Sequence, residues 1–264
     1  MQRLSRDGID LCFTEQGSGA PPLLFVHGWA CDHSYFQPQL DAFSGAHRCV
    51  SVDLRGHGES AKPEQAYTMP AFADDLAWLS GQLGLQRPVV IGHSMGGVIA
   101  LALAQRYPEL VGALVLVDSP VVPPAATAEQ IAKLFGALRA PDYLEVARQF
   151  VSGMFLPSSD PALKARVIAG MTAAPQHVMV SAGEEIWRFD SAAAAAACKA
   201  PVLNICAATP LPDLARLRAL CPQLINGQTV GAGHFNQLET PEQVNSMIAR
   251  FLAVAVIGEQ PAAV

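Results

Sequence analysis

A serine in a glycine-rich segment is the first feature of this sequence that could carry out chemistry. Residues 92–97 read G-H-S-M-G-G, which places Ser94 in a G-x-S-x-G pattern. A serine hydroxyl is a poor nucleophile at neutral pH and needs a base within hydrogen-bonding distance. A histidine, the residue type that most often serves as such a base, stands in another glycine-rich segment, as His234 of G-A-G-H-F at 231–235. A serine activated by a histidine would carry out nucleophilic attack on a carbonyl carbon, followed by acyl transfer.

The elements on either side of Ser94 make this pattern informative. Residues 89–92 form a short apolar run typical of a buried strand, and residues 95–106 have the apolar spacing of a helix. In such a strand–turn–helix unit a sharp turn raises the serine above the sheet, and the flanking glycines avoid side-chain clashes. We therefore expect Ser94 at the C-terminal end of a strand.

Short apolar runs alternate with longer amphipathic runs from residue 22 onward, which predicts an α/β protein with a parallel sheet covered on both faces. The sequence predicts strands at 23–27, 49–54, 89–92, 113–118, 202–207 and 224–230, after a hairpin within 7–15. It predicts helices at 34–43, 69–83, 95–106, 211–220 and 241–252. Ser34 and Thr240 are placed to cap the first and the last of these helices.

Residues 119–199 interrupt the alternation. This segment begins with prolines and continues in helical patterns rich in methionine, phenylalanine and leucine. It is far longer than an ordinary connection between strands, so we predict an inserted helical cap, with the core formed by 1–118 and 200–264. Because the segment holds no cluster of arginine or lysine, it predicts a pocket for an apolar group. We expect Trp29 and Trp187 to contribute to substrate binding.

Further motifs accompany the serine segment in a recognisable order: H-G at 27–28, D-L-R-G-H-G-E-S at 53–60 and G-A-G-H-F at 231–235. With these motifs the chain resembles the α/β-hydrolase fold family over essentially its whole length. The resemblance implies a mostly parallel central sheet flanked by helices, and no metal or organic cofactor. It also implies that the imidazole of His234 lies over Ser94, and that the backbone amides of Trp29 and Met95 form an oxyanion hole. We expect His27 and His93 to hold loops through hydrogen bonds rather than to transfer protons.

The acid that would orient His234 departs from the family's common pattern. The family usually carries this acid in the loop after the strand that corresponds to 202–207, where this chain has Thr209. A second location in the family is the end of the strand before the cap, which Asp118 occupies. Asp213 is the nearest acid after Thr209, but it falls in the first turn of a predicted helix, where the helix dipole favours an aspartate. We expect Asp118 to be the acid. Asp213, and a serine–histidine pair without an acid, are the alternatives.

The composition excludes several classes of protein. Of the 264 residues 51% are hydrophobic and 15% are charged, and the net charge is −6. Mild acidity without a Lys/Arg cluster argues against a nucleic-acid partner, and the most apolar stretches are interrupted or too short to span a membrane. Charges stand where a signal peptide would be apolar, which predicts a cytoplasmic location. Six scattered cysteines without a C-x-x-C motif predict neither a disulfide nor a metal site.

The function that the sequence predicts is a serine hydrolase of a carboxylic ester or lactone with an apolar acyl or aromatic group, acting through an acyl-enzyme on Ser94. The serine argues against dehalogenases and epoxide hydrolases of this fold, which need an aspartate nucleophile. One alternative is a cofactor-free dioxygenase of a heteroaromatic substrate, because residues 28–33 resemble the G-W-x-x-D-H turn of those enzymes. The other alternative is a non-catalytic ligand-binding homologue. A small-molecule substrate is the expected partner, and the sequence is compatible with both a monomer and a homo-oligomer.

Overall fold

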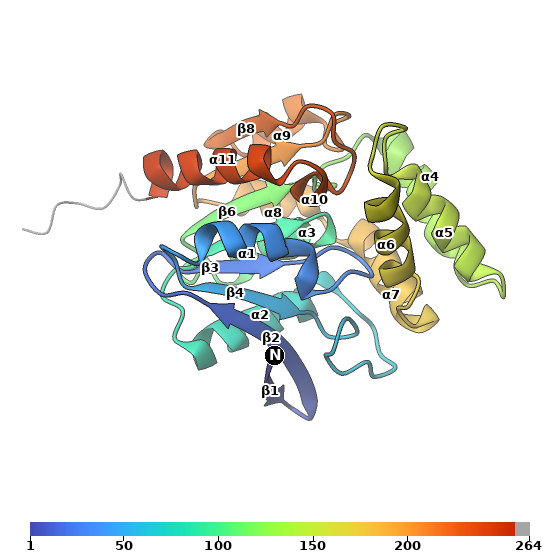
Figure 1. Ribbon diagram of the computed structural model, residues 1–264, viewed down its shortest axis with the longest axis horizontal. Coiled ribbons are helices and arrows are strands. Elements are labelled where there is room, and N and C mark those ends of the chain that lie inside the picture. The colour runs from blue at the N-terminus through green and yellow to red at the C-terminus, as the bar shows by residue number, and fades with distance from the viewer. Residues whose placement is uncertain (257–264) are drawn as a thin grey trace, which may run out of the picture.

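The computed structural model describes residues 1–256, and these form one eight-stranded sheet with helices around it (Figure 1). The strands lie in the order β1-β2-β4-β3-β5-β6-β7-β8, and all neighbours from β4 to β8 are parallel. Their bounds are β1 Gln2–Arg6, β2 Ile9–Gln16, β3 Leu23–Val26, β4 Cys49–Asp53, β5 Val89–His93, β6 Ala113–Val117, β7 Val202–Cys206 and β8 Leu224–Gln228. The predicted α/β class and mostly parallel sheet are confirmed. Residues 257–264, the end of the predicted second core segment, lie outside the described residues.

The antiparallel part of the sheet begins earlier than the sequence predicts. Strands β1 and β2 pair through a two-residue turn at Asp7 and Gly8, whose φ angles are 51° and 80°. Two consecutive residues with positive φ are what a tight hairpin of this hand requires. The prediction placed the hairpin within 7–15 and so missed β1. This strand lies at the edge of the sheet, with mostly exposed residues, and therefore lacks the apolar alternation that identifies a strand.

Helices cover both faces of the sheet (Figure 1). One face carries α1 (Gln37–Phe43) and α11 (Pro241–Phe251), whose buried side chains pack on β3, β5 and β6. The opposite face carries α2 (Met69–Leu83), α3 (Met95–Arg106), α8 (Ser191–Ala197) and α9 (Leu214–Leu220). Because both faces are buried, the parallel strands can be apolar throughout, as the sequence pattern suggested.

Two predicted helix starts differ from the structure. The predicted helix 34–43 is a 3₁₀ turn, η1 (His33–Phe36), followed by α1, and the carboxylate of Asp32 rather than Ser34 caps it by accepting the Ser34 N–H at 2.8 Å. The predicted helix 211–220 starts only at Leu214. Leu211 precedes a proline, and a residue before proline is disfavoured in the helical conformation.

The last predicted helix begins as expected at Pro241, but the expected cap is absent. The Thr240 hydroxyl donates to the carbonyl of Asn236 at 3.3 Å and makes no capping bond. The reason is a short helix, α10 (Asn236–Glu239), that runs directly into α11 and takes the threonine into its own last turn. A π-helical turn, η2 (Leu252–Val256), follows α11.

The residues between β6 and β7 form a group of helices beside the sheet. We refer to α4 (Ala125–Ala137), α5 (Tyr143–Gly153), α6 (Pro161–Met171) and α7 (Gln176–Arg188) as the α4–α7 segment. Figure 1 shows it beyond one end of the strands, apart from the helices on the sheet faces. Helix α8, which the prediction 119–199 included in the cap, instead packs against α3 on a sheet face. None of the helices described between residues 1 and 256 is long and apolar enough to cross a membrane.

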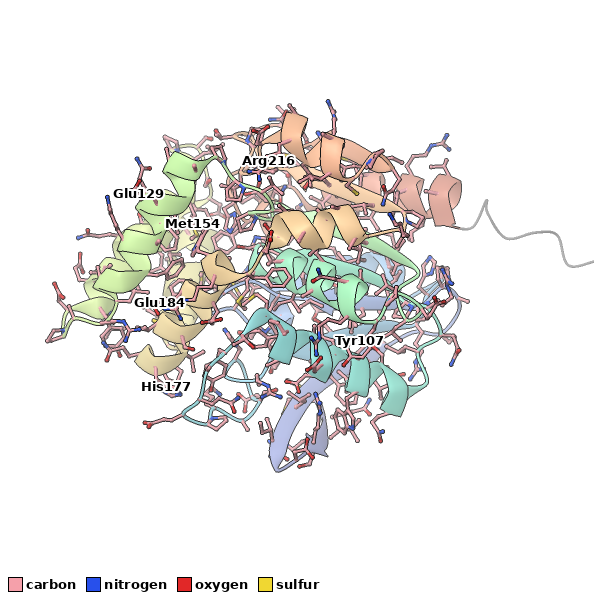
Figure 2. All side chains as sticks on the ribbon, turned by 180° about the vertical axis from the view of Figure 1, so that it is seen from behind. Tyr107, Glu129, Met154, His177, Glu184 and Arg216 are labelled. Atoms are coloured by element: carbon pink, nitrogen blue, oxygen red, sulfur yellow. The ribbon has the colours of Figure 1, made fainter. Side chains whose placement is uncertain are left out.

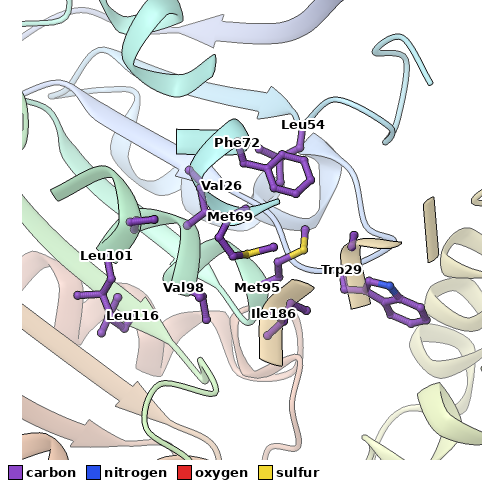
Figure 3. Close-up of a cluster of buried hydrophobic side chains, with 14 of the residues drawn as sticks. Val26, Trp29, Leu54, Met69, Phe72, Met95, Val98, Leu101, Leu116 and Ile186 are labelled. Atoms are coloured by element: carbon purple, nitrogen blue, oxygen red, sulfur yellow. The ribbon is translucent and has the colours of Figure 1, made fainter. Parts of the chain in front are cut away.

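A single hydrophobic cluster joins the sheet to the α4–α7 segment. Figure 3 shows it running from Leu101 and Leu116 in the core past Met95 to Ile186 of α7 and to Trp29. All five side chains are at most 6% exposed. The turn that carries Ser94 therefore lies on a closely packed core, and the α4–α7 segment packs against the same core.

Candidate active site

Ser94 lies at the junction of β5 and α3, in a backbone conformation that is unusual for a serine. Its φ is 52° and its ψ is −119°, and its N–H donates to the carbonyl of Val117 at 2.9 Å. A side chain at Gly96 would lie 2.0 Å from the carbonyl oxygen of Val26, and one at Gly92 would lie 2.3 Å from Gly96. The turn therefore closes only with glycine at both positions, and it holds Ser94 at the end of the strand as the sequence predicts.

His234, in the loop after β8, forms a hydrogen bond with Asp118, the residue that follows β6. The Nδ1–H of His234 donates to Oδ2 of Asp118 at 2.7 Å, and the side chain of Asp118 is 2% exposed. The second carboxylate oxygen, Oδ1, accepts the N–H of Ala207 at 2.9 Å. Because Nδ1 carries the proton of the neutral ring, Nε2 is left with a free lone pair, which is the form required of a general base.

Asp213, the other acid that the sequence offered, lies elsewhere. It caps α9, where its carboxylate accepts the N–H of Arg216 at 3.0 Å, and it is exposed. Thr209, at the position where the family commonly has its acid, lines the cavity described below. The structure thus brings Asp118, and not Asp213, to His234.

Two histidines next to the candidate residues bind backbone groups through their ring nitrogens, and one of them, His93, also lines the cavity described below. His93 donates from Nε2 to the carbonyl of His234 at 2.9 Å, and the two rings are 4.7 Å apart. His27 donates from Nδ1 to the carbonyl of Gly28 and accepts the N–H of Leu54 at Nε2. Burial lowers the pKa of both His27 and His93, so both are neutral near pH 7. This agrees with the expectation that they support loops.

The loop after β3 approaches Ser94 closely. A side chain at Gly28 would lie 3.1 Å from the Cβ of Ser94 and 2.9 Å from Nδ1 of His93. Trp29 follows directly, and Ala30 has a positive φ of 56°, which turns the chain sharply. Met95 is the first residue of α3, where an N–H has no acceptor within the helix. The backbone amides of Trp29 and Met95 thus lie in the two segments that flank the serine.

The indole of Trp29 connects this loop to the α4–α7 segment, a contact that the sequence did not reveal. Its Nε1–H donates to the carbonyl of Met179 in α7 at 2.8 Å. Its ring meets Phe135 of α4 and Phe150 of α5 edge-on, at 5.1 and 5.9 Å between centroids. No local pattern announces this contact because its partners lie more than a hundred residues away along the chain.

A cavity of about 290 Å³ lies between the sheet and the α4–α7 segment. Ser94, His234 and Asp118 line it, as do both predicted binding residues, Trp29 and Trp187. The rest of its wall is largely apolar and includes Ile131, Phe135, Phe150, Met154, Met171 and Ile186. Among the described residues that line it there is no lysine, arginine or glutamate, so the cavity suits an uncharged ligand.

A cluster of Asp32, His33 and Asp53 has the residue types of a metal site, with ligand atoms within 4.8 Å of one another. Its hydrogen bonds indicate a structural role. Oδ1 of Asp53 accepts from the backbone and the ring of His33, and Oδ2 accepts the N–H of Glu59 at 2.8 Å. Burial alone would raise the pKa of Asp53, but the hydrogen bonds from His33 and from the N–H of Glu59 outweigh it and lower that pKa. Asp32 and His33, the end of the dioxygenase-like turn, do not line the cavity.

Comparison with known proteins supports the fold described above. Residues 21–159 match the family described as alpha/beta hydrolase fold. The AB hydrolase superfamily protein YisY of Bacillus subtilis is 27% identical over 258 residues, which are 90% of this chain and 94% of that protein. The 2-(acetamidomethylene)succinate hydrolase of Mesorhizobium japonicum is 37% identical over 117 residues, so the match spans only 44% of this chain and 42% of that protein.

Among solved structures, a thermophilic esterase from Thermogutta terrifontis is similar over its whole length. It is 27% identical, superposes with a TM-score of 0.86, and the match covers 97% of this chain and 100% of the esterase. The family match covers more than half of the 264 residues, and the strand order and the glycine-flanked Ser94 turn fit it. The chain belongs to the α/β-hydrolase fold family.

Proposed function

We propose that this protein is a serine hydrolase that cleaves a carboxylic ester or lactone with an apolar acyl or aromatic group. The observation that carries the proposal is the 2.7 Å bond between His234 and Asp118 in the wall of the cavity that Ser94 also lines. It leaves Nε2 of His234 free to act as a base in the space where the serine hydroxyl is presented.

The chemistry proceeds in two acyl transfers. Oγ of Ser94 attacks the carbonyl carbon while Nε2 of His234 takes the hydroxyl proton, and the Asp118 carboxylate stabilises the imidazolium that forms. The C–O bond to the leaving group breaks, His234 gives its proton to the leaving oxygen, and the acyl group remains on Ser94. Water then attacks the acyl-enzyme with His234 again as the base, which releases the carboxylic acid and restores Ser94.

The negative charge on the carbonyl oxygen needs hydrogen-bond donors at each tetrahedral stage. We assign this role to the backbone amides of Trp29 and Met95, which belong to the two segments that flank Ser94. Such donors are effective because they are fixed before the charge develops and because little water surrounds them. The close packing of Gly28 against Ser94 supports this assignment.

The substrate class follows from the cavity. We propose that the α4–α7 segment acts as a cap, and that its apolar residues, with Trp29 and Trp187, surround an uncharged acyl or aromatic group. The relative from Mesorhizobium japonicum is named for a succinate, which is a dicarboxylate. The described lining residues here include no lysine or arginine to pair with such charges, so we propose a different substrate.

The proposal includes a cytoplasmic location, which is consistent with six cysteines that are all free and buried.

A fluorophosphonate probe and a pair of p-nitrophenyl esters test the proposal. We expect the probe to label Ser94, and p-nitrophenyl acetate and butyrate to be hydrolysed. In Ser94→Ala labelling should vanish and kcat should fall by about 10³-fold or more. Oxygen consumption with a hydroxyquinolone and no esterase activity would indicate the cofactor-free dioxygenase instead. Stabilisation by esters or lactones without turnover of any of them would indicate a binding protein.

A further inference from the structure

The segment that carries His234 is attached to the α4–α7 segment at its backbone. We call residues 231–235 the histidine loop and residues 154–160 the α5–α6 link. The N–H of His234 donates to the carbonyl of Met154, the first residue of the link, at 2.9 Å. Figure 2 labels Met154, which lies on the side of the molecule that carries α4 and α7. Next to this bond the rings of Phe155 and Phe235 stack at 5.0 Å with an interplanar angle of 23°. The backbone of His234, the base of the proposed reaction, is thus bound by the α5–α6 link, which also lines the cavity.

A carboxylate from a third element joins the same two segments. Glu239, the last residue of α10, accepts the N–H of Gly233 at Oε1, at 2.9 Å. Its other oxygen, Oε2, accepts the hydroxyl proton of Ser159. Oγ of Ser159 in turn accepts the N–H of Leu156 at 3.0 Å, which closes a turn within the α5–α6 link. One side chain therefore bridges the histidine loop and the link, with each carboxylate oxygen bound to a different segment.

The fit at this bridge is close. A side chain at Gly233 would lie 2.5 Å from the carbonyl oxygen of Met154 and 3.1 Å from Oε1 of Glu239. The histidine loop can approach the link this closely only because it presents glycine there. The approach brings the N–H groups of Gly233 and His234 to separate acceptors, Glu239 and Met154.

We propose that Glu239 is a positioning residue: its carboxylate, with the hydroxyl of Ser159, latches the histidine loop to the α5–α6 link and so holds the imidazole of His234 in place. The inference rests on the proposed function, in which His234 is the base. Glu239 does not line the cavity, so it acts only through the loop. His93 binds the carbonyl of His234 and Met154 binds its N–H, so the N–H of Gly233 is the group of the histidine loop that the latch holds.

The expected consequence is a loss in the chemical step rather than in binding. Hydrogen bonds to a carboxylate are stronger than those between neutral groups, and a misplacement of about 1 Å at a reacting group can cost about 10²-fold in rate. We expect Glu239→Ala to lower kcat for p-nitrophenyl butyrate by at least about tenfold while KM changes by less than about threefold. Glu239→Gln keeps an oxygen for the Gly233 N–H and should recover most of kcat.

Matched controls separate the latch from a general loss of a surface group. Glu242→Ala removes an exposed carboxylate from the first turn of α11, and Ser158→Ala removes an exposed hydroxyl next to Ser159. Both should keep kcat within about twofold of the wild type, because both side chains are exposed and neither forms a hydrogen bond with the histidine loop. Ser159→Ala should lower kcat in the same sense as Glu239→Ala. The double variant should lose little more than the larger single loss if the two side chains act as one unit.

Hydrogen–deuterium exchange tests the latch without any substrate. In Glu239→Ala the amides of Gly233 and His234 should exchange at least about tenfold faster than in the wild type or in Glu242→Ala. Unchanged exchange, or a kcat equal to that of Glu242→Ala, would overturn the inference. A wild-type protein that neither reacts with the fluorophosphonate nor hydrolyses esters would instead refute the proposed function, and the exchange rates would then still decide whether the latch exists.

Discussion

Replacing Asp118 by asparagine tests the pair on which the proposed mechanism depends. The oxygen of an asparagine can keep the N–H of Ala207, which Oδ1 of Asp118 accepts at 2.9 Å. Its NH₂ group would then face Nδ1 of His234, where Oδ2 now accepts a proton at 2.7 Å. The imidazole would be forced to carry its proton on Nε2, and Nε2 could no longer take the proton of Ser94.

The size of the loss follows from the charge that is removed. A carboxylate about 4 Å from the centre of an imidazolium contributes about 4 kcal/mol at an effective dielectric constant of about 20. This corresponds to a factor of about 10³ in rate, and the wrong tautomer adds to it, so we expect kcat to fall by about 10³–10⁴-fold. Because the Asp118 side chain is only 2% exposed, water has little access to the site and does not stabilise the imidazolium in place of the carboxylate. The melting temperature should fall by only a few degrees, because the Ala207 bond is retained.

Asp213→Asn is the matched comparison, since Asp213 was the competing acid. Asparagine caps helices nearly as well as aspartate, so α9 should be retained and kcat should stay within about twofold of the wild type. Steady-state kinetics with p-nitrophenyl butyrate, together with thermal unfolding followed by circular dichroism, measures both effects. If Asp118→Asn kept kcat within about tenfold of the wild type while folded Asp213→Asn lost turnover, the assignment of Asp118 would be wrong.

Two further predictions concern stability and the loop at Trp29. Burial lowers the pKa of three histidines that the proposed mechanism does not titrate, and for His57 it lowers the pKa to about 3; the three are His27, His57 and His93. Below about pH 6.5 the unfolded chain binds protons at these three sites more readily than the folded chain does, and the three outweigh His33, whose pKa the bond to Asp53 raises. Urea unfolding should therefore show stability falling toward pH 5. Each of the three histidines should lower the free energy of unfolding by up to about 1.4 kcal/mol per pH unit. A free energy of unfolding that stays level over this range would contradict the lowered pKa values of these histidines. Trp29→Phe removes the donor to the Met179 carbonyl and should cost about 0.5–1.5 kcal/mol of unfolding free energy while lowering kcat, because the Trp29 amide shifts with the side chain. An unchanged kcat in that variant would show that the indole does not hold the loop.

The sequence could indicate the residues of the candidate site where a local pattern requires them. Ser94 needs glycines on both sides because its turn leaves no room for a Cβ at Gly92 or Gly96. The fold therefore requires a sequence pattern that is visible within six residues. The glycines before His234 mark a second such close approach, at Gly233. These are steric requirements of the backbone, and they are legible in a single sequence.

Contacts that depend on the meeting of distant segments leave no such mark. The bond from Trp29 to Met179 and the bridge from Glu239 to Ser159 each use an ordinary residue whose role is set by its partner. Local rules also fail where two residues satisfy them equally. Asp32 and Ser34 both suit a helix N-terminus, and the structure uses Asp32 because the helix begins with a 3₁₀ turn. Strand β1 was missed because an edge strand does not need an apolar face.

The order of the strands explains the position of Asp118, the acid of the proposed mechanism. β6 and β7 are parallel neighbours, with Val117 opposite Ile205, so the residues that follow them emerge side by side at the same edge of the sheet. An acid after either strand can therefore face the histidine loop. In this chain the carboxylate of Asp118 follows β6, and the residue after β7, Ala207, supplies the backbone N–H that orients it. The loop after β7 therefore does not need to supply the acid, and Thr209 and Leu211 of this loop line the cavity. Because a threonine and a leucine stand at that part of the wall, the loop after β7 adds no charge to the cavity, which is consistent with the uncharged substrate that we propose.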